Sequence, residues 1–218
     1  VITGPLSYLL CFFAAWLINE MPKGLRVFLT FIFYAPSLTT SVYFVWQLIF
    51  SGDSYGIVNG LLMNLGLVSE PVQWLTDPRY NLGILIVVQL WMSLGTSFLA
   101  FIAGFQSIDA SLYEAGDIDG VRNRYQELLY ITLPSMKPQL LFGAVMGISG
   151  AFSIGDVTTT LAGYPSTDNV ATTIVNLIQD VGYTRFELGY ASAMATVLFL
   201  LMFGSRWLVN KLLARLGT

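Results

Sequence analysis

Few side chains in this sequence can do covalent chemistry. The 218 residues include no histidine, which excludes imidazole metal ligands and histidine acid–base catalysis. The single cysteine, Cys11, lies in an apolar run, so the chain can form no internal disulfide bond. There is no Gly-Lys pair and therefore no phosphate-binding P-loop, so any nucleotide chemistry has to come from a partner. We expect no catalytic residue, no metal site and no cofactor in the chain itself.

Polar residues inside apolar runs suggest a different chemistry, the binding of a polar solute. Asp156 is the only acidic residue within one of the long apolar segments. At 100° per residue it shares a helical face with the hydroxyl groups of Ser149, Ser153 and Thr160. A polar face in lipid must meet protein or water, and carboxylates with hydroxyls suit hydrogen bonding to a polyol. The alternative is a structural Asp156 whose carboxylate is satisfied by water or backbone.

Two further patterns accompany this polar face. Gln89, Ser93 and Thr96 share a face in an earlier apolar segment, although hydroxyl groups in membrane helices often bond only to their own backbone. A row of small residues lies opposite Asp156 and predicts close contact with a neighbouring helix. Its members are Gly143, Gly147, Ala151 and Gly155.

The composition indicates that a membrane surrounds these residues. The chain is 55% hydrophobic and only 11% charged, whereas soluble domains carry about 25% charged residues. Several runs approach or exceed the roughly 20 apolar residues that cross a bilayer as a helix. A net charge of −3 gives no basic face for nucleic acid. We expect an all-α, polytopic bundle that forms one transmembrane domain over residues 1–218.

Five apolar segments predict five membrane-spanning helices. They cover roughly Gly4–Ile18, Leu25–Phe50, Leu82–Phe105, Gln139–Leu161 and Leu188–Val209. Pro36 predicts a kink in the second helix. Because Val1 stands inside an apolar stretch without a charged flank, the first helix is expected to be truncated.

The basic residues set the orientation of this bundle. Eight of the ten Lys and Arg residues fall on one side of an alternating five-helix topology, and only Arg79 and Arg185 fall on the other. Since Lys and Arg are enriched in cytoplasmic loops, residues 106–135 and the C-terminus are expected in the cytoplasm. Residues 51–80 and 162–187 are expected outside, at the membrane interface.

The outer segments contain further helix and anchor signals. Trp46 and Trp74 are interpreted as interface anchors. Apolar residues on one helical face over 167–181 predict an amphipathic helix. Its polar side, with Asn169 and Asn176, would face a partner that arrives from outside. Simple packing of this helix on the membrane spans is the alternative.

The polar stretch between the third and fourth apolar segments predicts two short helices. Asp109 caps the first helix and Gly120 ends it at a bend with positive φ. Asn123 starts the second, with Gln126 completing a capping-box-like start, and Pro134 ends it. Two helices bent at a glycine and held directly on two membrane spans would form a lever, and connectors of this length are uncommon as plain loops.

The same stretch resembles a known family. The sequence EAGDIDG (Glu114–Gly120), followed by ITLP (Ile131–Pro134), resembles the EAA loop of bacterial ABC importer permeases. That pattern is Glu-Ala-Ala, three residues, Gly, then nine residues and Ile-x-Leu-Pro. Residues 89–115 and 186–202 are similar to the maltose-type sugar permeases, and the likeness covers effectively the whole chain, with the first span of that family absent.

The resemblance implies a function and a set of partners. It assigns coupling to an ATPase to Glu114, Ala115, Gly116, Asp117 and Gly120, because in that family the glutamate end of the loop docks in a cleft of a cytoplasmic ATPase. The chain would be a permease subunit of an ATP-driven sugar importer in the bacterial cell membrane. A cytoplasmic ABC ATPase dimer, which binds ATP and Mg²⁺, a second permease subunit, an extracytoplasmic solute-binding protein and membrane lipid would be its partners.

Two features depart from the family pattern. Gly116 replaces alanine, which lowers helix stability by about 1 kcal/mol within a helix. Ten residues instead of nine, Val121–Tyr130, separate Gly120 from Ile131. Because one residue added inside a helix rotates its face by about 100°, we expect the turn at Val121–Arg122 to hold the extra residue.

Two other classes of function compete with this interpretation. A self-sufficient secondary transporter would show an internal repeat, broken midplane helices and ion-coupling carboxylates. The sequence shows no such repeat and one acidic residue within its spans. A membrane-embedded enzyme would need a convergent constellation of catalytic or metal-binding residues, which the sequence does not offer.

Overall fold

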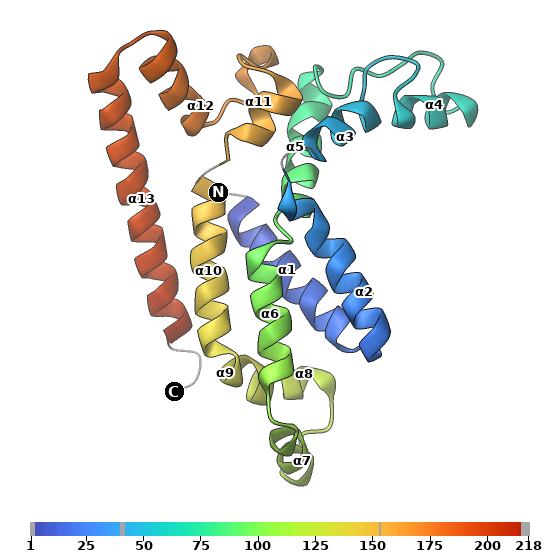
Figure 1. The fold of residues 1–218 in the computed structure, drawn as a ribbon, viewed down its shortest axis with the longest axis vertical. Helices are drawn as coiled ribbons and strands as arrows, with labels where there is room; N and C mark the ends of the chain where they lie inside the picture. The colour runs from blue at the N-terminus through green and yellow to red at the C-terminus, as the bar shows by residue number, and fades with distance from the viewer. Residues whose placement is uncertain (1–2, 40–41, 153, 215–218) are drawn as a thin grey trace. The chain divides into compact units, whose positions relative to one another are not determined.

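The protein is described here by a computed structural model of residues 3–39, 42–152 and 154–214, the side chains of 212–214 excepted. Within these ranges every regular element is a helix, which confirms the predicted all-α class (Figure 1). The elements are α1 (Thr3–Asn19), α2 (Lys23–Tyr34), η1 (Ala35–Leu38), α3 (Val42–Ile49), α4 (Ile57–Asn64), α5 (Pro78–Met92), α6 (Thr96–Ser107), α7 (Ala110–Ile118), α8 (Arg124–Glu127), η2 (Leu128–Thr132), α9 (Leu133–Ser135), α10 (Lys137–Phe152), α11 (Asp156–Ala162), η3 (Thr167–Asn169), α12 (Ile174–Gln179), η4 (Asp180–Thr184) and α13 (Leu188–Ala214). The segments η1 and η3 are 3₁₀-helices, and η2 and η4 are π-helices.

Three of the five predicted spans are each interrupted. The second predicted span comprises α2, η1 and α3, the third comprises α5 and α6, and the fourth comprises α10 and α11. Among the described residues, the helix Leu188–Lys211 alone is long and apolar enough to cross a membrane. Within the described ranges, up to four helices pass the same test if each interrupted pair counts as one span. The prediction of continuous third and fourth helices is therefore wrong, whereas the second was predicted to be kinked.

A proline and two closely approached glycines mark these interruptions. Pro36 is buried in η1, directly after α2 ends, which confirms the predicted interruption at this proline. Gly95 is the N-cap of α6, and a Cβ atom there would lie only 3.2 Å from the Cβ atom of Ser37. Gly155 is the N-cap of α11, and a Cβ atom there would lie 3.1 Å from Val175 Cγ1. At both glycines a neighbouring residue approaches the backbone closely.

The chain divides into two compact units. Unit 1 comprises residues 1–37, 93–151 and 201–218, and unit 2 comprises residues 38–92 and 152–200. Unit 1 contains α1, α2 and the stretch from α6 to α10, and unit 2 contains α3 to α5, α11 and α12. The elbow, defined as residues 106–135, belongs entirely to unit 1.

Unit 1 is held together by α1 and α6, which pack along each other. The ring of Phe12 lies 5.7 Å from that of Phe101 and 5.5 Å from that of Phe105, measured between centroids. The Cys11 thiol donates a hydrogen bond to the Ser93 carbonyl oxygen at 3.2 Å. In a membrane, where lipid is as apolar as leucine, such packing and hydrogen bonding carry helix association. We therefore regard α1 and α6 as one rigid pair.

The small residues of α10 contribute to the same unit. Gly143 is buried against the ring of Phe101, and its carbonyl oxygen accepts a hydrogen bond from the Ser97 hydroxyl at 3.2 Å. A Cβ atom at Gly4 would lie 3.1 Å from Ala151 Cβ. Close helix contact is thus confirmed at these two positions, whereas Gly147 has no neighbour within 4 Å of where its Cβ atom would be.

Unit 2 has an apolar core between α5 and α11, which includes Leu85, Val88, Val157 and Leu161. A chain of aromatic rings lies over this core, with successive ring centroids 5.2–6.3 Å apart. Its members are Trp91, Trp46, Phe50, Trp74 and Tyr80.

One buried asparagine organises the outer segment of unit 2 before α5. The Asn59 amide nitrogen donates to the carbonyl oxygens of Ser51, Asp53 and Val72, and its Oδ1 atom accepts from Val72 N and Trp74 Nε1. The indole N–H of the half-buried Trp74 is thus bonded within the protein, and its role as an interface anchor stays a prediction.

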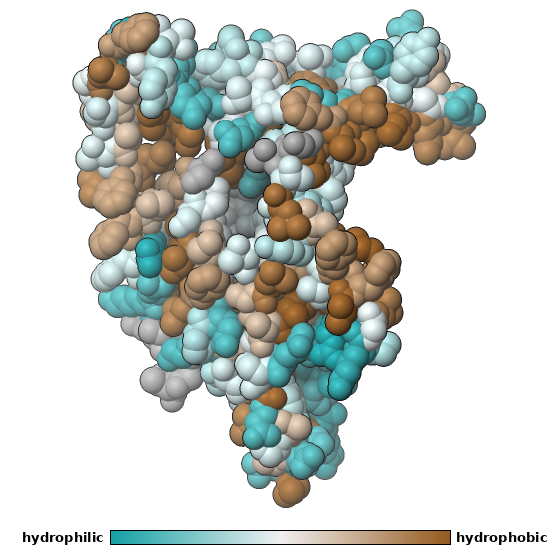
Figure 2. Space-filling model, viewed as in Figure 1, coloured by the Kyte–Doolittle hydropathy of each residue, from teal (hydrophilic) through white to brown (hydrophobic). Residues whose placement is uncertain are grey.

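The surface agrees with a membrane setting. Figure 2 shows hydrophobic side chains over α2 and α13, whereas mostly hydrophilic side chains cover the α7 end of unit 1. In the most apolar window of α13 only 6% of the residues are buried inside the molecule. Most sides of this helix therefore remain available for lipid or another subunit.

Candidate functional site

The first helix of the elbow, α7, starts as the sequence predicts. Asp109 is its N-cap, and the carboxylate accepts a hydrogen bond from the Ser111 N–H at 3.0 Å. This hydrogen bond favours the ionised form and holds the pKa of Asp109 below its usual value. Figure 1 shows α7 beyond the end of α6, at one extremity of unit 1. The cap fixes the direction in which α7 leaves the membrane helix.

The motif residues of α7 divide into an exposed set and a buried position. Glu114, Ala115 and Asp117 are exposed, whereas Gly116 is buried. Ile118 was not singled out from the sequence, yet its side chain is 88% exposed at the end of the helix. The signal that could have identified Ile118 from the sequence is an apolar residue four positions after Glu114 on an otherwise polar helix. Together these side chains offer acidic groups and one apolar contact to a partner.

Gly120 forms the bend between the two helices of the elbow. Its φ is +89°, which confirms the predicted positive φ. The Val121 N–H donates to the Gly116 carbonyl oxygen at 2.9 Å, and the Gly120 N–H donates to the Asp117 carbonyl oxygen at 3.4 Å. These two bonds define a Schellman motif, in which glycine adopts the left-handed conformation without a steric penalty. The bend is therefore built into the backbone.

The second helix of the elbow also starts at the predicted residue. Asn123 is the N-cap of α8 and accepts from the Gln126 N–H at 2.9 Å. The Gln126 side chain reaches back one residue further than in a capping box and accepts from the Arg122 N–H at 2.9 Å. The helix continues through η2 and α9 and ends at Ser135, one residue after the predicted end at Pro134.

A π-helical turn, η2, lies inside this second helix and bears on the extra residue of the motif. A π-turn closes over one more residue than an α-turn and thus accommodates an additional residue within a helix. The structure therefore offers η2 as a second location besides the expected turn at Val121–Arg122. Near η2, a Cβ atom on Gly116 would lie 2.5 Å from Ile131 Cδ1, so an alanine here would require the isoleucine side chain to shift.

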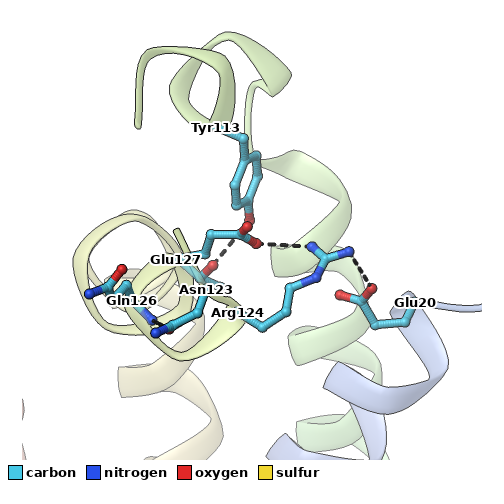
Figure 3. Close-up of polar contacts among 7 residues, drawn as sticks. Glu20, Tyr113, Asn123, Arg124, Gln126 and Glu127 are labelled. Atoms are coloured by element: carbon cyan, nitrogen blue, oxygen red, sulfur yellow. Dashed lines mark hydrogen bonds and ion pairs between the residues drawn. The ribbon is translucent and has the colours of Figure 1, made fainter. Parts of the chain in front are cut away.

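Side-chain contacts tie the two helices of the elbow to each other and to α1. The Tyr113 hydroxyl of α7 lies 3.1 Å from the Thr132 hydroxyl of η2. The Arg124 guanidinium lies 2.9 Å from the Glu127 carboxylate and 3.0 Å from the Glu20 carboxylate (Figure 3). Hydrogen bonding to Glu127 and the charge of Glu20 raise the pKa of Arg124, so this side chain stays protonated.

The polar residues of the fourth predicted span do not share one continuous helix. Ser149 lies on α10 in unit 1 and donates to the Val145 carbonyl oxygen at 2.9 Å, as hydroxyl groups in membrane helices often do. Asp156 and Thr160 lie on α11 in unit 2, and Ser153 lies outside the described residues. The expectation of a single polar face along this span is wrong, because α10 ends before α11 begins.

The polar residues of the third predicted span are likewise separated. Gln89 lies on α5 in unit 2, Ser93 lies in unit 1 after that helix has ended, and Thr96 is the first residue of α6. The interruption between α5 and α6 removes the continuous helix on which their common face depended.

Unit 2 does bring other polar side chains to Asp156 and Thr160. Asp156 is exposed in the first turn of α11, and α11 packs against α3, which carries Tyr43. The Gln47 amide, also on α3, donates a hydrogen bond to the Thr160 carbonyl oxygen. The sequence analysis missed Tyr43 and Gln47, although two polar residues four positions apart in an apolar helix were a usable signal.

The second outer segment differs most from its predicted form. Residues 167–181 are not one helix, because Asp168 and Asn169 adopt positive φ and α12 begins only at Ile174. Asn176 is 3% exposed, so the expectation that it faces a partner is wrong. Its amide donates to the Gly155 carbonyl oxygen at 3.2 Å and to the Thr159 hydroxyl at 2.7 Å. These bonds attach α12 to α11.

No group of three or more potential His, Cys, Asp or Glu metal ligands occurs among the residues that the structure describes. The geometry therefore points to the elbow, a rigid projection with exposed acidic side chains, as the principal candidate site. The polar cluster on α3 and α11 is the second.

Comparison with known proteins identifies relatives of the chain in sequence and in fold. A protein family described as "Binding-protein-dependent transport system inner membrane component" matches residues 9–218. The arabinooligosaccharides transport system permease protein AraP of Bacillus subtilis (strain 168) is 29% identical over 191 residues, which are 87% of this chain and 60% of AraP. The trehalose/maltose transport system permease protein MalF of Thermococcus litoralis is 29% identical over 86% of this chain and 62% of MalF.

A solved structure extends this comparison. It shows a bacterial alginate ABC transporter in complex with an alginate pentasaccharide-bound periplasmic protein. One of its chains is 25% identical to this chain, with a TM-score of 0.81 over 99% of this chain and 78% of that one. The present chain spans only about 60% of the length of the curated relatives named above.

Proposed function

Because the chain belongs to the family of binding-protein-dependent transport system inner membrane components, we propose that it is the permease subunit of an ATP-driven importer for a sugar or oligosaccharide. It is a multi-pass inner-membrane protein, and its own contribution is a solute path and a mechanical connection. ATP and Mg²⁺ would be bound by a partner ATPase, so this subunit carries out no chemistry itself. The oligosaccharide and sugar transport systems among its relatives support the solute class.

The observation that carries this proposal is the geometry of the elbow. A capped helix, a Schellman bend at Gly120 and a second capped helix hold Glu114, Asp117 and Ile118 exposed at one end of unit 1. Fixed geometry is what transmission of force requires, because a flexible loop would absorb the movement of a partner. Charged residues at such an interface matter by about 2–5 kcal/mol when one member of a desolvated pair is removed.

The proposed assembly has two ATPase subunits, a second permease subunit and an extracytoplasmic solute-binding protein. The distribution of Lys and Arg supports five spans, with the elbow and the C-terminus in the cytoplasm. Closure of the ATPase pair would push the two elbows and change the equilibrium between inward- and outward-open states. A conformational change of this kind needs differential stabilisation of the two states, which ATP binding and hydrolysis supply.

The solute path in this proposal includes the polar cluster of unit 2. Asp156 and Tyr43 would offer hydrogen-bond partners to sugar hydroxyl groups, with Thr160, Gln89, Ser93, Ser149 and Ser153 as further candidates. Asp156→Asn should leave assembly and ATP-driven closure intact and change the rate or solute preference of uptake. Wild-type uptake kinetics of this variant in reconstituted vesicles would assign Asp156 a structural role.

The coupling proposal is tested with the complete complex. Glu114→Lys should leave the spans inserted but reduce co-purification of the ATPase and binding-protein-stimulated ATP hydrolysis, because it places a cation where the docking site expects a carboxylate. Asn169→Lys, at an exposed residue of the outer segment, is a surface-charge control for the co-purification measurement alone, because this segment is expected to face the binding protein. Retention of the ATPase with full stimulated hydrolysis and uptake by Glu114→Lys would exclude the elbow as the coupling element.

Measurements of uptake distinguish the importer from a secondary transporter. Broken helices, which this chain has in three predicted spans, also occur in secondary transporters. Uptake by the purified chain that follows an ion gradient and needs no ATPase would favour that alternative. Uptake that requires both ATP and the binding protein would exclude it.

A further inference from the structure

The elbow contacts the end of α1, a connection that no motif in the sequence indicates. Arg124, the first residue of α8, places its Nη2 atom 3.0 Å from Oε2 of Glu20, which directly follows the last residue of α1. Its Nη1 atom lies 2.9 Å from Oε2 of Glu127. Figure 3 shows the guanidinium between the two carboxylates, one from the elbow and one from the end of α1. Arg124 thus links two parts of unit 1 that lie far apart in the sequence.

An aromatic contact supports the same link. The ring of Trp16 in α1 lies 6.4 Å from the ring of Tyr125 in α8, with an angle of 53° between the ring planes. Trp16 precedes Glu20 by four residues and so lies on the same helical side. Tyr125 directly follows Arg124. Two adjacent residues of α8 therefore meet two positions on one side of α1, which fixes the orientation of α8 and not only its distance.

The opposite side of the link is rigid as well. Phe12 packs against Phe101 and Phe105 of α6, and the Tyr8 hydroxyl donates to the Leu140 carbonyl oxygen of α10 at 3.3 Å. These contacts all lie within unit 1. A displacement of α8 would therefore reach α1 directly, as well as reaching α6 and α10 through the chain.

From these contacts we propose that Glu20 is a positioning residue for coupling, which makes α1 the third membrane helix driven by the elbow. The inference rests on the proposed function, since the connection acts only when a partner pushes the elbow. Arg124 and Glu20 are 64% and 40% exposed, so the ion pair by itself contributes little to stability. The ion pair holds α8 in the orientation in which a displacement of α8 also moves α1.

Glu20→Gln is the most selective variant, because Arg124 keeps its bond to Glu127 and the elbow keeps its internal structure. We expect insertion, thermal stability and ATPase binding to be unchanged and the ATP hydrolysed per solute transported to rise about two- to fivefold, as expected for the loss of an exposed ion pair. Arg124→Gln should behave similarly, and the double variant should be no worse than Arg124→Gln alone. Lys23→Gln, which removes an exposed charge at the start of α2, should keep the wild-type ratio.

A crosslinking experiment tests movement directly. In a Cys11→Ser chain, Glu20→Cys and Arg124→Cys would be bridged by a short thiol-specific crosslinker in the assembled complex. Because α1 and α8 move together in this proposal, the bridged complex should keep more than half of its uptake. A tenfold loss of uptake on bridging, or a wild-type ratio in both Glu20→Gln and Arg124→Gln, would overturn the proposal. Failure of the proposed function would instead abolish ATP-dependent uptake in the unmodified chain.

Discussion

The elbow and the outer segment 163–187 each have an asparagine side chain that forms hydrogen bonds at the start of a helix, but the two asparagines have different roles. In the elbow, Asn123 caps α8, is exposed, and accepts one hydrogen bond from a residue three positions ahead. In the outer segment, Thr173 and Asn176 form a capping box at the start of α12, but Asn176 is buried and also bonds to Gly155 and Thr159. One asparagine only starts a helix, whereas the other also attaches its helix to α11.

The difference teaches how each region can serve a transporter. The capping bonds of the elbow are local, so its exposed side chains remain free for a partner while its backbone stays fixed. The outer segment uses its polar side chains internally, since a buried amide must satisfy its hydrogen-bonding groups within the protein. Its outward surface is therefore provided by other residues, such as the exposed Asn169.

The largest effect should come from the bend of the elbow. Gly120→Val places a β-branched residue at a φ of +89°, a conformation that such residues rarely adopt, so α7 should change direction. We expect loss of ATPase co-purification and of stimulated hydrolysis in the assembled importer. Gly120→Asn is the matched control, because asparagine tolerates the left-handed region and should retain most activity. Equal activity of the two variants would show that the conformation of the bend does not matter for coupling.

A smaller effect, on stability, should come from the outer segment. Asn176→Ala removes the bonds to Gly155 and Thr159 in a buried site, which typically costs about 1–3 kcal/mol. Thermal unfolding of the purified complex should show a lower midpoint, and proteolysis within 163–187 should become faster. Gln179→Ala changes an exposed residue with helical φ and ψ in the same segment and should alter neither measurement. An unchanged midpoint for Asn176→Ala would mean that the attachment to α11 does not contribute to stability.

The smallest effect should come from the contact between Gly116 and Ile131 in the elbow. Gly116→Ala gains about 1 kcal/mol of helix propensity but places a Cβ atom 2.5 Å from Ile131 Cδ1, so its net effect should be near zero or destabilising. Ile131→Val removes that Cδ1 atom and costs about 0.5–1.5 kcal/mol alone. In the double variant the alanine should become stabilising. Strictly additive changes in thermal stability across this cycle would exclude the steric explanation.

Both helices of the elbow begin at the predicted residues because their signals act within a few residues. Asp109 and Asn123 each accept from a backbone N–H two or three positions ahead, and Gly120 closes a bend whose bonds span three to five residues. Such contacts form whatever the rest of the chain does, so the residue types suffice to predict them. The same holds for the apolar composition that places the chain in a membrane.

The continuity of the spans was not predictable in this way. Apolar runs over 82–105 and 139–161 fit one long helix each, and the pattern does not record that Ser37 approaches Gly95 or that Val175 approaches Gly155. We inferred the common polar faces by placing successive residues 100° apart on one continuous helix. They are wrong because these helices are interrupted. The position of the extra residue of the EAA-like motif was likewise not predictable, because both the turn after Gly120 and the π-turn η2 are able to hold it.

The sequence by itself therefore determined the membrane class, the all-helical fold, the capped elbow and the glycine bend, because periodicity, composition and capping act over a few residues. Only the tertiary structure decided that Asn176 is buried on α11, that Gly116 lies against Ile131, and that Glu20 meets Arg124. Each of these contacts joins residues brought together by packing, 15 or more positions apart in the chain. No local pattern specifies such a pairing, since the same residue types would be equally compatible with an exposed position.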